Sequence, residues 1–218
     1  MEGQIGVIFD MDGVIVDTNP YHKKAWQSFC NRYGVFLSDR EFKTEVFGRI
    51  NKNALKYIFN KQLTFEEIEK YSAEKEKIFC DIYQDQVRPV NGLVNFLTQL
   101  QKEPCFKIGL ATSAPKGNMD LVLDKLNLRG FFAVLVDASL VKEGKPNPEI
   151  FFITSRLLGT PPEDCIVFED SISGINAATN AGMKTVGLTT THPREELPQT
   201  KILINDFTEI DVKTLRCL

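Results

Sequence analysis

The hydrophobic positions of this chain follow two different periods. Residues 5–9 form a short apolar run, which predicts a buried strand. From about residue 18 to residue 88 the apolar positions recur every three or four residues, the period of helices that bury one face. From residue 90 onward, short apolar runs alternate with segments of helical period, which predicts successive strand and helix units.

The segment 18–88 predicts a bundle of helices. Its first apolar stripe has the i, i+3, i+4, i+7 spacing of an amphipathic helix and consists of Trp26, Phe29, Cys30 and Tyr33. Ser38 with Glu41, and Thr64 with Glu67, have the spacing of capping boxes, so two further helices are expected to begin there. Pro89 restricts the residue before it, and the helical pattern ends at this point.

The remainder of the chain predicts a sheet whose strands are separated by helices. Strands are expected at residues 106–111, 132–136, 165–168, 185–188 and 202–204, and helices at residues 93–100, 119–126, 148–158 and 171–181. Such alternation is typical of a doubly wound parallel sheet. We therefore expect an α/β fold with a Rossmann-like core of residues 1–17 and 89–218, into which residues 18–88 are inserted as a helical domain.

Composition narrows the class of protein without changing this picture. A chain of 218 residues with 43% hydrophobic and 25% charged residues is typical of a soluble globular protein. The formal net charge of -3, without a run of Lys or Arg, argues against nucleic acid and anionic membranes as partners. No apolar run approaches the roughly 18 residues of a membrane span, and no basic leader precedes the first strand, so a cytoplasmic location is expected. Five scattered cysteines without a C-x-x-C pair indicate neither a disulfide framework nor a zinc site.

Polar side chains follow the ends of several predicted strands. They are Asp10 and Asp12 after the first strand, Thr112 and Ser113 after the next, Glu169 and Asp170 after a later one, and Lys145 in an adjoining loop. Because the carboxyl ends of parallel strands meet at one edge of a sheet, these side chains are expected in one crevice. Two carboxylates one residue apart repel each other unless a cation or a reaction uses them. The set suits phosphoryl chemistry, with carboxylates for Mg²⁺, a hydroxyl and an ammonium for phosphate oxygens, and a carboxylate nucleophile.

Each of these residues taken alone also has a structural interpretation. Thr112 by itself is more often a helix cap than a phosphate ligand, and Lys145 by itself is a solvated loop lysine. The lysine loop is not a Walker loop, because no G-x-x-x-x-G precedes the lysine and no Ser or Thr follows it. Ser171 is expected to cap the helix after the acidic pair, and His192, next to Pro193, to lie on a surface loop.

The order of the motifs carries a family resemblance. Asp10-Met11-Asp12-Gly13-Val14, Thr112-Ser113, Gly144-Lys145-Pro146, and Glu169-Asp170-Ser171 with Gly174 resemble the four ordered motifs of the haloacid dehalogenase superfamily. The helical insertion between the first two motifs resembles the first cap class of that superfamily. Within it, the chain is similar to the β-phosphoglucomutase-like phosphatases, and the likeness covers most of the core.

The resemblance implies a role for each core residue. Asp10 is the expected nucleophile that carries the phosphoryl group, and Lys145 offsets the repulsion between this carboxylate and an anionic substrate. Asp12 is expected to protonate the leaving oxygen and then to activate the hydrolytic water. Thr112 and the amide of Ser113 are expected to bind the phosphoryl oxygens.

Mg²⁺ is the cofactor that the resemblance implies. Its expected ligands are oxygens of Asp10, Asp170 and Glu169, the backbone carbonyl of Asp12, and waters. Asp12 also narrows the reaction, because dehalogenases of the superfamily lack this aspartate and its ion-pumping ATPases have threonine there. The chain therefore resembles phosphatases and phosphomutases.

Residues of the helical insertion, the cap, are expected to select the substrate. His22 resembles the hinge histidine that faces the active site in sugar-phosphate members, and Arg49, after Gly48, falls on the substrate-specificity loop of the family. Lys116 and Asn118, just after the second motif, are further candidates for substrate contact. Each also has a structural interpretation, as a helix-start residue for His22 and as a solvated surface residue for Arg49.

Three kinds of function remain open. The first is a Mg²⁺-dependent phosphatase of a small phosphorylated metabolite such as a sugar phosphate, with inorganic pyrophosphatase as a variant. The second is a phosphomutase of the β-phosphoglucomutase type, and the third is a non-enzymatic metabolite-binding protein. Asn51 stands where such mutases have an arginine that binds a second phosphate, and Lys116 lies farther from Ser113 than the corresponding lysine of mutases. Both departures favour hydrolysis by a chain that is expected to be monomeric.

Overall fold

A parallel sheet forms the centre of the computed structural model, which describes residues 4–46 and 49–218. Within these residues the sheet has six strands in the order β3-β2-β1-β4-β5-β6. The strands are β1 Ile5–Phe9, β2 Phe106–Ala111, β3 Val134–Val136, β4 Cys165–Glu169, β5 Lys184–Leu188 and β6 Ile202–Ile204. The strand order reverses between β1 and β4, which is where open α/β sheets bind ligands.

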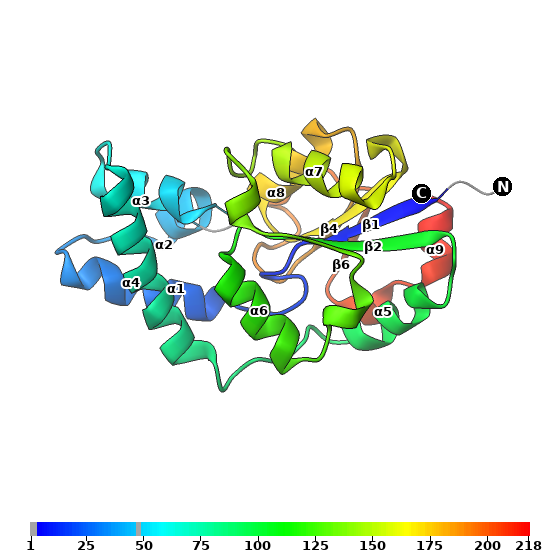
Figure 1. Cartoon of the computed structure of the whole chain (residues 1–218), viewed down its shortest axis with the longest axis horizontal. Helices are drawn as coiled ribbons and strands as arrows, with labels where there is room; N and C mark the ends of the chain where they lie inside the picture. Colours follow the sequence, from blue (N-terminus) through cyan, green and yellow to red (C-terminus); the bar gives the residue numbers. More distant parts are fainter. Residues whose placement is uncertain (1–3, 47–48) are drawn as a thin grey trace.

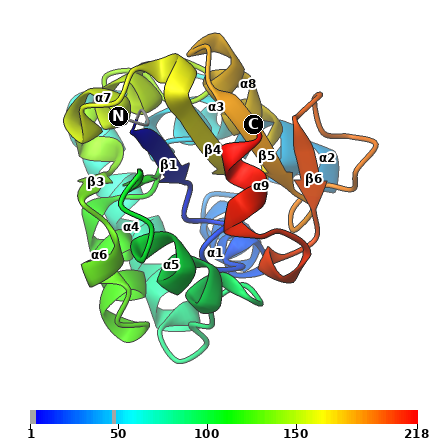
Figure 2. The same cartoon turned by 90° about the vertical axis from the view of Figure 1, so that its right-hand side faces the viewer.

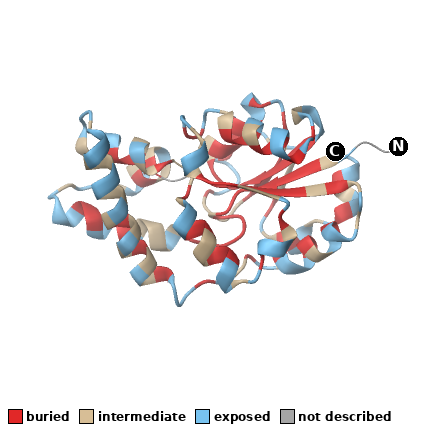
Figure 3. Cartoon of the chain, viewed as in Figure 1, coloured by how far each residue is buried: buried red, intermediate tan, exposed pale blue. Residues whose placement is uncertain are grey.

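Alternation along β1 explains why helices cover both faces of the sheet. Val7 and Phe9 pack on one side with α5 (Leu93–Gln101), α6 (Lys116–Lys125) and α9 (Val212–Arg216). Ile8 packs on the other side with α7 (Glu149–Leu158) and α8 (Ile172–Asn180). Figure 2 looks along the sheet with α7 and α8 on one side and α5 and α6 on the other. The inner strands β2, β1, β4 and β5 are consequently buried along almost their whole length, whereas the edge strands β3 and β6 are half-buried (Figure 3).

Within the described residues, four of the five α-helices between β1 and β2, together with a π-helix, gather beyond the carboxyl ends of the strands, away from the two termini (Figure 1). They are α1 Asn19–Arg32, α2 Asp39–Glu41, the π-helix Phe42–Val46, α3 Asn51–Phe59 and α4 Phe65–Tyr83. Both predicted capping boxes are formed, at Ser38 with Glu41 and at Thr64 with Glu67. These helices enclose a separate apolar cluster that includes Trp26 and Phe29.

The chain enters and leaves this helical part at adjacent points. Val16 forms an antiparallel bridge with Pro89, and the amide of Val90 donates to the carbonyl of Ile15 at 2.9 Å. This pairing supports the cap boundaries that we propose, residues 18–88, within a core of residues 1–17 and 89–218. No helix in the described ranges has the length and hydrophobicity needed to cross a lipid bilayer.

The predicted α/β class with an inserted helical cap is confirmed, and the differences are local. β3 begins at Val134, two residues later than predicted, because its parallel pairing with β2 starts there, with two residues separating it from a short 3₁₀-helix at Arg129–Phe131. The helices α3 and α9 were not predicted individually. α9 has only five residues, too few to display a helical period.

Candidate active site

The register of the sheet brings distant parts of the sequence to one edge. Phe9 of β1 lies opposite Leu110 of β2 and Phe168 of β4. The next residues, Asp10 and Glu169, therefore leave their strands side by side, and the amide of Asp10 donates to the carbonyl of Phe168 at 3.0 Å. Parallel pairing places both carboxylates at the edge predicted for the site.

Lys145 lies between these two carboxylates. Its Nζ donates to Oδ1 of Asp10 at 2.7 Å and to Oε1 of Glu169 at 2.6 Å. The lysine is only 2% exposed, and its ammonium also lies 5.2 Å from the ring centre of Phe151. Since a buried ammonium needs paired anions, this geometry argues against a solvated loop lysine.

Glu169 is anchored by the turn that starts α8. Its Oε2 accepts hydrogen bonds from the amides of Asp170 and Ser171 and from the hydroxyl of Ser171. The same hydroxyl accepts from the amide of Gly174 and caps the helix. A Cβ at Gly174 would lie 1.7 Å from Oε1 of Glu169, so only glycine allows the helix to approach this carboxylate.

Asp170 is held from both parts of the molecule. Its Oδ2 accepts from Nδ2 of Asn19, at the start of α1, at 3.3 Å and from the hydroxyl of Thr191. Gly13 has a φ of +85°, and a Cβ there would lie 1.8 Å from Oδ2 of Asp170. Glycine at position 13 thus serves both the turn after β1 and the close approach of this carboxylate.

The site concentrates more negative charge than Lys145 can balance. Oxygens of Asp10, Glu169 and Asp170 lie within 4.8 Å of one another, and all three residues are buried. Burial raises the pKa of Asp10 to about 7, with Lys145 opposing the shift and Glu169 and Asp12 adding to it. Burial, followed by Glu169 and Asp10, also raises the pKa of Asp170 well above its usual value. An all-oxygen donor set with excess negative charge fits a hard divalent cation such as Mg²⁺.

Asp12 is bound to the first turn of the cap. Its Oδ1 accepts a hydrogen bond from the hydroxyl of Thr18 and lies 3.4 Å from Nε2 of His22. Burial acts to raise the pKa of Asp12, but His22, Thr18 and the charge of Lys75 outweigh it and hold the pKa below its usual value. The second aspartate therefore favours its ionised form while the cap is in place.

A polar pair on α4 completes the pocket, and sequence reasoning missed it. Lys75 is 2% exposed, and its Nζ lies 2.9 Å from both Nδ1 of His22 and Oε1 of Glu76. The ammonium also lies 5.0 Å from the ring centre of Trp26. A signal for it exists in the sequence, because the apolar stripe Ile68, Tyr71, Phe79 and Ile82 passes through position 75.

Only some of the other residues that the sequence predicted for substrate binding line the pocket. His22, Arg49 and Ser113 line the pocket between cap and core, together with Asp10, Asp12 and Lys145. Thr112 is fully buried, and its hydroxyl accepts from the amide of Ala114 at 3.0 Å.

Lys116 does not line this pocket. It has 68% of its side chain exposed and pairs with Asp120 at 2.5 Å, on the exterior of α6.

Arg49 lines the pocket directly, whereas Asn118 is buried behind the residues that line it. Nη2 of Arg49 donates to the carbonyl of Thr44 and lies 3.0 Å from a carboxylate oxygen of Glu45, while its Nε is buried without a partner in the described part of the chain. Asn118 is buried behind the pocket wall and donates to Glu76. Gly48 lies outside the described residues.

Comparisons with known proteins show the family of this chain. The family model described as haloacid dehalogenase-like hydrolase matches residues 7–188. A phosphorylated carbohydrates phosphatase of Thermotoga maritima is 31% identical over 184 residues, which cover 83% of this chain and 82% of the relative. The β-phosphoglucomutase of Bacillus subtilis is 34% identical over 193 residues, which cover 84% of this chain and 82% of the relative.

Solved structures show the same arrangement. The crystal structure of a β-phosphoglucomutase from Clostridium difficile superimposes with a TM-score of 0.86 at 27% identity, over 98% of this chain and 96% of that one. The matched region includes the core and the helical insertion. The chain therefore belongs to the haloacid dehalogenase-like hydrolases, among the β-phosphoglucomutase-like phosphatases.

Proposed function

We propose that this enzyme is a Mg²⁺-dependent phosphatase that hydrolyses a small phosphorylated carbohydrate or similar metabolite through an aspartyl phosphate on Asp10. The observation that carries the proposal is the buried contact of Lys145 with Asp10 and Glu169. A second aspartate, Asp12, follows Asp10 by two residues in the sequence and accepts a hydrogen bond from Thr18 of the cap. The similarity to the carbohydrate phosphatase of Thermotoga maritima supports the substrate class.

In the first step, a carboxylate oxygen of Asp10 attacks phosphorus, and the bond from phosphorus to the leaving oxygen breaks. Lys145, which donates to Asp10, keeps positive charge beside the two anions as they meet. Asp12 gives its proton to the leaving oxygen. The pKa of Asp12 lies below its usual value, and the negative charge of an incoming phosphate raises it toward the protonated state that this step needs.

In the second step, Asp12 accepts a proton from water while that water attacks the phosphorus of the aspartyl phosphate. The bond to Asp10 breaks, and inorganic phosphate leaves. Thr18 and His22 hold Asp12 near the leaving side, so one carboxylate serves as acid and then as base. Ser113 lines the pocket and, with Thr112 behind it, is proposed to bind the phosphoryl oxygens.

Mg²⁺ is the proposed cofactor because three buried carboxylates face one ammonium. Asp10 and Asp170 would hold it, with Glu169 and the backbone carbonyl of Asp12 as the further proposed ligands. A bound Mg²⁺ neutralises charge on the phosphoryl oxygens and lowers the barrier to attack by an anion.

The second candidate function is a phosphomutase. The similarity to the β-phosphoglucomutase of Bacillus subtilis favours it. A mutase passes through a doubly phosphorylated intermediate, so its cap must bind a second phosphate. Asn51 donates to Glu76 at 2.8 Å, and Lys116 points away from the pocket, so neither position supports such binding.

A paired assay separates the two candidates. Phosphate release with Mg²⁺ is measured across sugar phosphates, nucleotides and pyrophosphate, beside a coupled assay for conversion of β-glucose 1-phosphate to glucose 6-phosphate. Release with a clear preference for one sugar phosphate is the expected result. Isomerisation without net release would replace the phosphatase by a mutase, and preference for pyrophosphate would replace it by a pyrophosphatase.

A further inference from the structure

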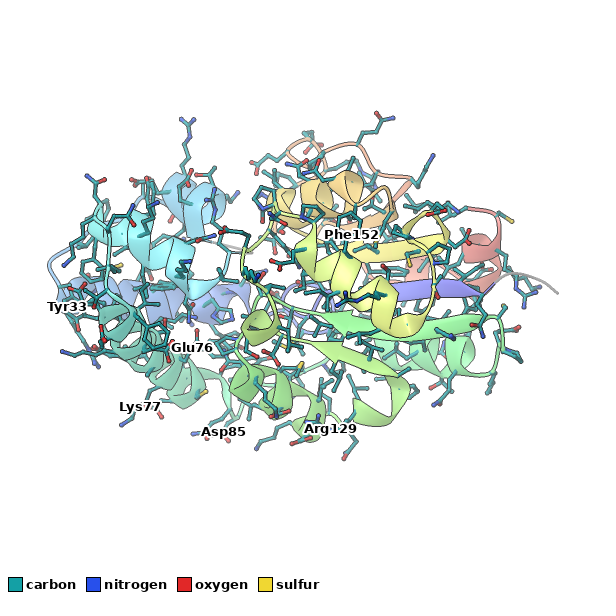
Figure 4. All side chains as sticks on the ribbon, turned by 45° about the horizontal axis from the view of Figure 1, so that its top comes forward. Tyr33, Glu76, Lys77, Asp85, Arg129 and Phe152 are labelled. Carbon is teal, nitrogen blue, oxygen red and sulfur yellow. The ribbon has the colours of Figure 1, made fainter. Side chains whose placement is uncertain are left out.

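Glu76 is a carboxylate in the wall of the pocket that the reaction does not use. It lies on α4 and lines the pocket together with Asp12 and His22, with 14% of its side chain exposed. Figure 4 shows Glu76 on the side of α4 that faces α6, whereas its neighbour Lys77 points outward. A charged group in such a place needs either partners or a ligand.

Three donors from different elements hold this carboxylate. Oε1 accepts from Nζ of Lys75 at 2.9 Å and from Nδ2 of Asn51 at 2.8 Å, and Oε2 accepts from Nδ2 of Asn118 at 2.5 Å. Burial acts to raise the pKa of Glu76, but Lys75, His22 and the hydrogen bonds outweigh it, so the pKa lies below its usual value. Glu76 is therefore ionised at neutral pH. Since a carboxylate has about four acceptor positions, one stays available to a donor from the pocket.

The cations that line the pocket already have carboxylate partners in the described part of the chain. Lys145 pairs with Asp10 and Glu169, Lys75 with Glu76, and Arg49 with Glu45. A substrate with one phosphate reaches Lys145 and the proposed Mg²⁺ site. A second phosphate on the same substrate would contact the cap residues that line the pocket. There the positive side chains are already paired with carboxylates, and Glu76 is negatively charged.

We infer that Glu76 is a specificity-determining residue, which accepts a hydroxyl of the leaving group and excludes substrates that carry a second phosphate. The inference rests on the proposed phosphatase function and deepens it. The substrate class is thus a polyol or sugar monophosphate with free hydroxyls away from its phosphate. A second phosphate placed against the ionised carboxylate of Glu76 is repelled, and the cations on the same wall, Lys75 and Arg49, are already paired with carboxylates.

The test compares two ligands that differ by one phosphate. Fructose 1-phosphate and fructose 1,6-bisphosphate are titrated calorimetrically with Mg²⁺ into the full chain carrying Asp10→Asn, which blocks turnover. The monophosphate is expected to bind at least about tenfold more tightly. Adding Glu76→Gln keeps the shape and removes the charge, and it is expected to reduce this ratio at least about tenfold.

Two controls fix the interpretation. Glu74→Gln makes the same change on the same helix, where Glu74 pairs with Arg32 at 2.8 Å and Tyr33 at 2.7 Å outside the pocket, and it should leave the ratio unchanged. Glu76→Asp keeps the charge and should keep the preference for the monophosphate. A ratio that is unchanged in Glu76→Gln would assign the exclusion to shape and overturn the inference.

Further outcomes are also decisive. Equal or tighter binding of the bisphosphate, or no binding of the monophosphate, overturns the inference even if Glu76→Gln does not fold, since both are measured without that substitution. The proposed function is tested separately by hydrolysis of para-nitrophenyl phosphate with Mg²⁺ by the unmodified chain, because this compound has neither hydroxyls nor a second phosphate. If para-nitrophenyl phosphate is hydrolysed but the two fructose phosphates bind equally well, the inference about Glu76 is rejected and the phosphatase function stands. If para-nitrophenyl phosphate is not hydrolysed, the proposed phosphatase function is rejected.

Discussion

Single residues at the centre of the site have more than one task, because two carboxylates share the buried ammonium of Lys145 and a third carboxylate lies within 4.8 Å of them. Lys145 contacts both the proposed nucleophile and Glu169, and Asp170 is fixed from the cap and from the core. A substitution here changes charge and geometry together. A mutational test of one residue therefore needs a replacement that keeps either the charge or the shape of the side chain constant.

Asp10→Asn keeps the shape of the side chain and removes the nucleophile. We expect kcat to fall by at least about a thousandfold, as for other covalent nucleophiles. Lys145 retains its contact with Glu169, so the melting temperature should stay within a few degrees. Phosphate release and calorimetric melting measure the two effects, and near-normal turnover would disprove the aspartyl phosphate mechanism.

Gly13→Ala should weaken metal binding. A Cβ at this position would lie 1.8 Å from Oδ2 of Asp170 and so displace a proposed ligand. We expect the Mg²⁺ concentration for half-maximal activity to rise at least about tenfold. Gly34→Ala is the matched control, because Gly34 also has a positive φ, of +67°, but nothing lies within 4 Å of its Cβ. The control should cost about 1 to 2 kcal/mol of stability and leave the Mg²⁺ dependence unchanged.

Glu76 should also give the protein a pH-dependent part of its stability. Its pKa is lowered in the folded state from 4.5, so the unfolded chain binds its proton more readily. The contribution is therefore present above pH 4.5 and is lost as the pH falls through the lower folded value. Denaturant unfolding of wild type and Glu76→Gln should show a stability difference that shrinks between pH 6 and pH 3. A difference that stays constant over this range would contradict the assignment.

Sequence reasoning located the residues at strand ends and, in the cap, the pocket residues His22 and Arg49, but it missed Lys75 and Glu76. Asp10, Glu169 and Asp170 are predictable because the end of a parallel strand is a fixed place in the fold. Lys75 and Glu76 lie in a helix rich in charged residues, where a buried charge looks like a solvated one. His192 was expected on the surface, and this prediction was wrong, because the residue is 2% exposed and its ring lies beside Glu196. The prediction rested on the neighbouring Pro193, and a proline does not indicate whether the side chain before it is buried.

At the scale of elements, local chemistry decided what could be predicted. The strands β2 and β6 match their predicted bounds, because each is a short apolar run with clear ends. The capping boxes at Ser38 and Thr64 also form where predicted, since a cap depends on residues only three apart. β3 was predicted two residues too long, because Phe132 and Ala133 extend the apolar run but precede the pairing of β3 with β2.

The capping box of α4 should contribute measurably to stability. The hydroxyl of Thr64 accepts from the amide of Glu67, and Glu67 accepts from the amide of Thr64 at 2.8 Å. Thr64→Ala removes one of these bonds and should lower the free energy of unfolding by about 1 kcal/mol. Thr98→Ala is the comparison, because Thr98 donates only to the carbonyl of Val94 within α5. That change should be neutral or slightly stabilising, and equal losses in both variants would argue against a capping effect.

At the scale of the whole molecule, the site exists only where cap and core meet. Asn19 contacts Asp170, His22 contacts Asp12, and Asn118 of the core donates to Glu76 of the cap. On the far side, Lys43 of the cap lies 3.6 Å from Glu196 of the core. Substrate binding is thus expected to change how the two parts contact each other.

Trp26 should report this change. It is the single tryptophan of the chain, is 3% exposed, and lines the pocket with the ammonium of Lys75 over its ring. Addition of Mg²⁺ with orthovanadate, a phosphate analogue, should therefore shift or quench the tryptophan emission. Trp26→Phe should abolish the signal, and an emission that stays constant while calorimetry records binding would contradict a pocket that closes over its ligand.

The central position of β1 has a consequence for synthesis on the ribosome. β1 leaves the ribosome before the other described strands, and its two neighbours in the sheet, β2 and β4, begin only at residues 106 and 165. The cap helices follow β1 directly and enclose an apolar cluster of their own, so they can fold while β1 still lacks partners. Asp10 meets Lys145 and Glu169 only after most of the chain has been made. A nascent chain released before residue 106 would therefore lack both sheet neighbours of β1, and one released before residue 165 would lack Glu169 and Asp170, two of the proposed Mg²⁺ ligands.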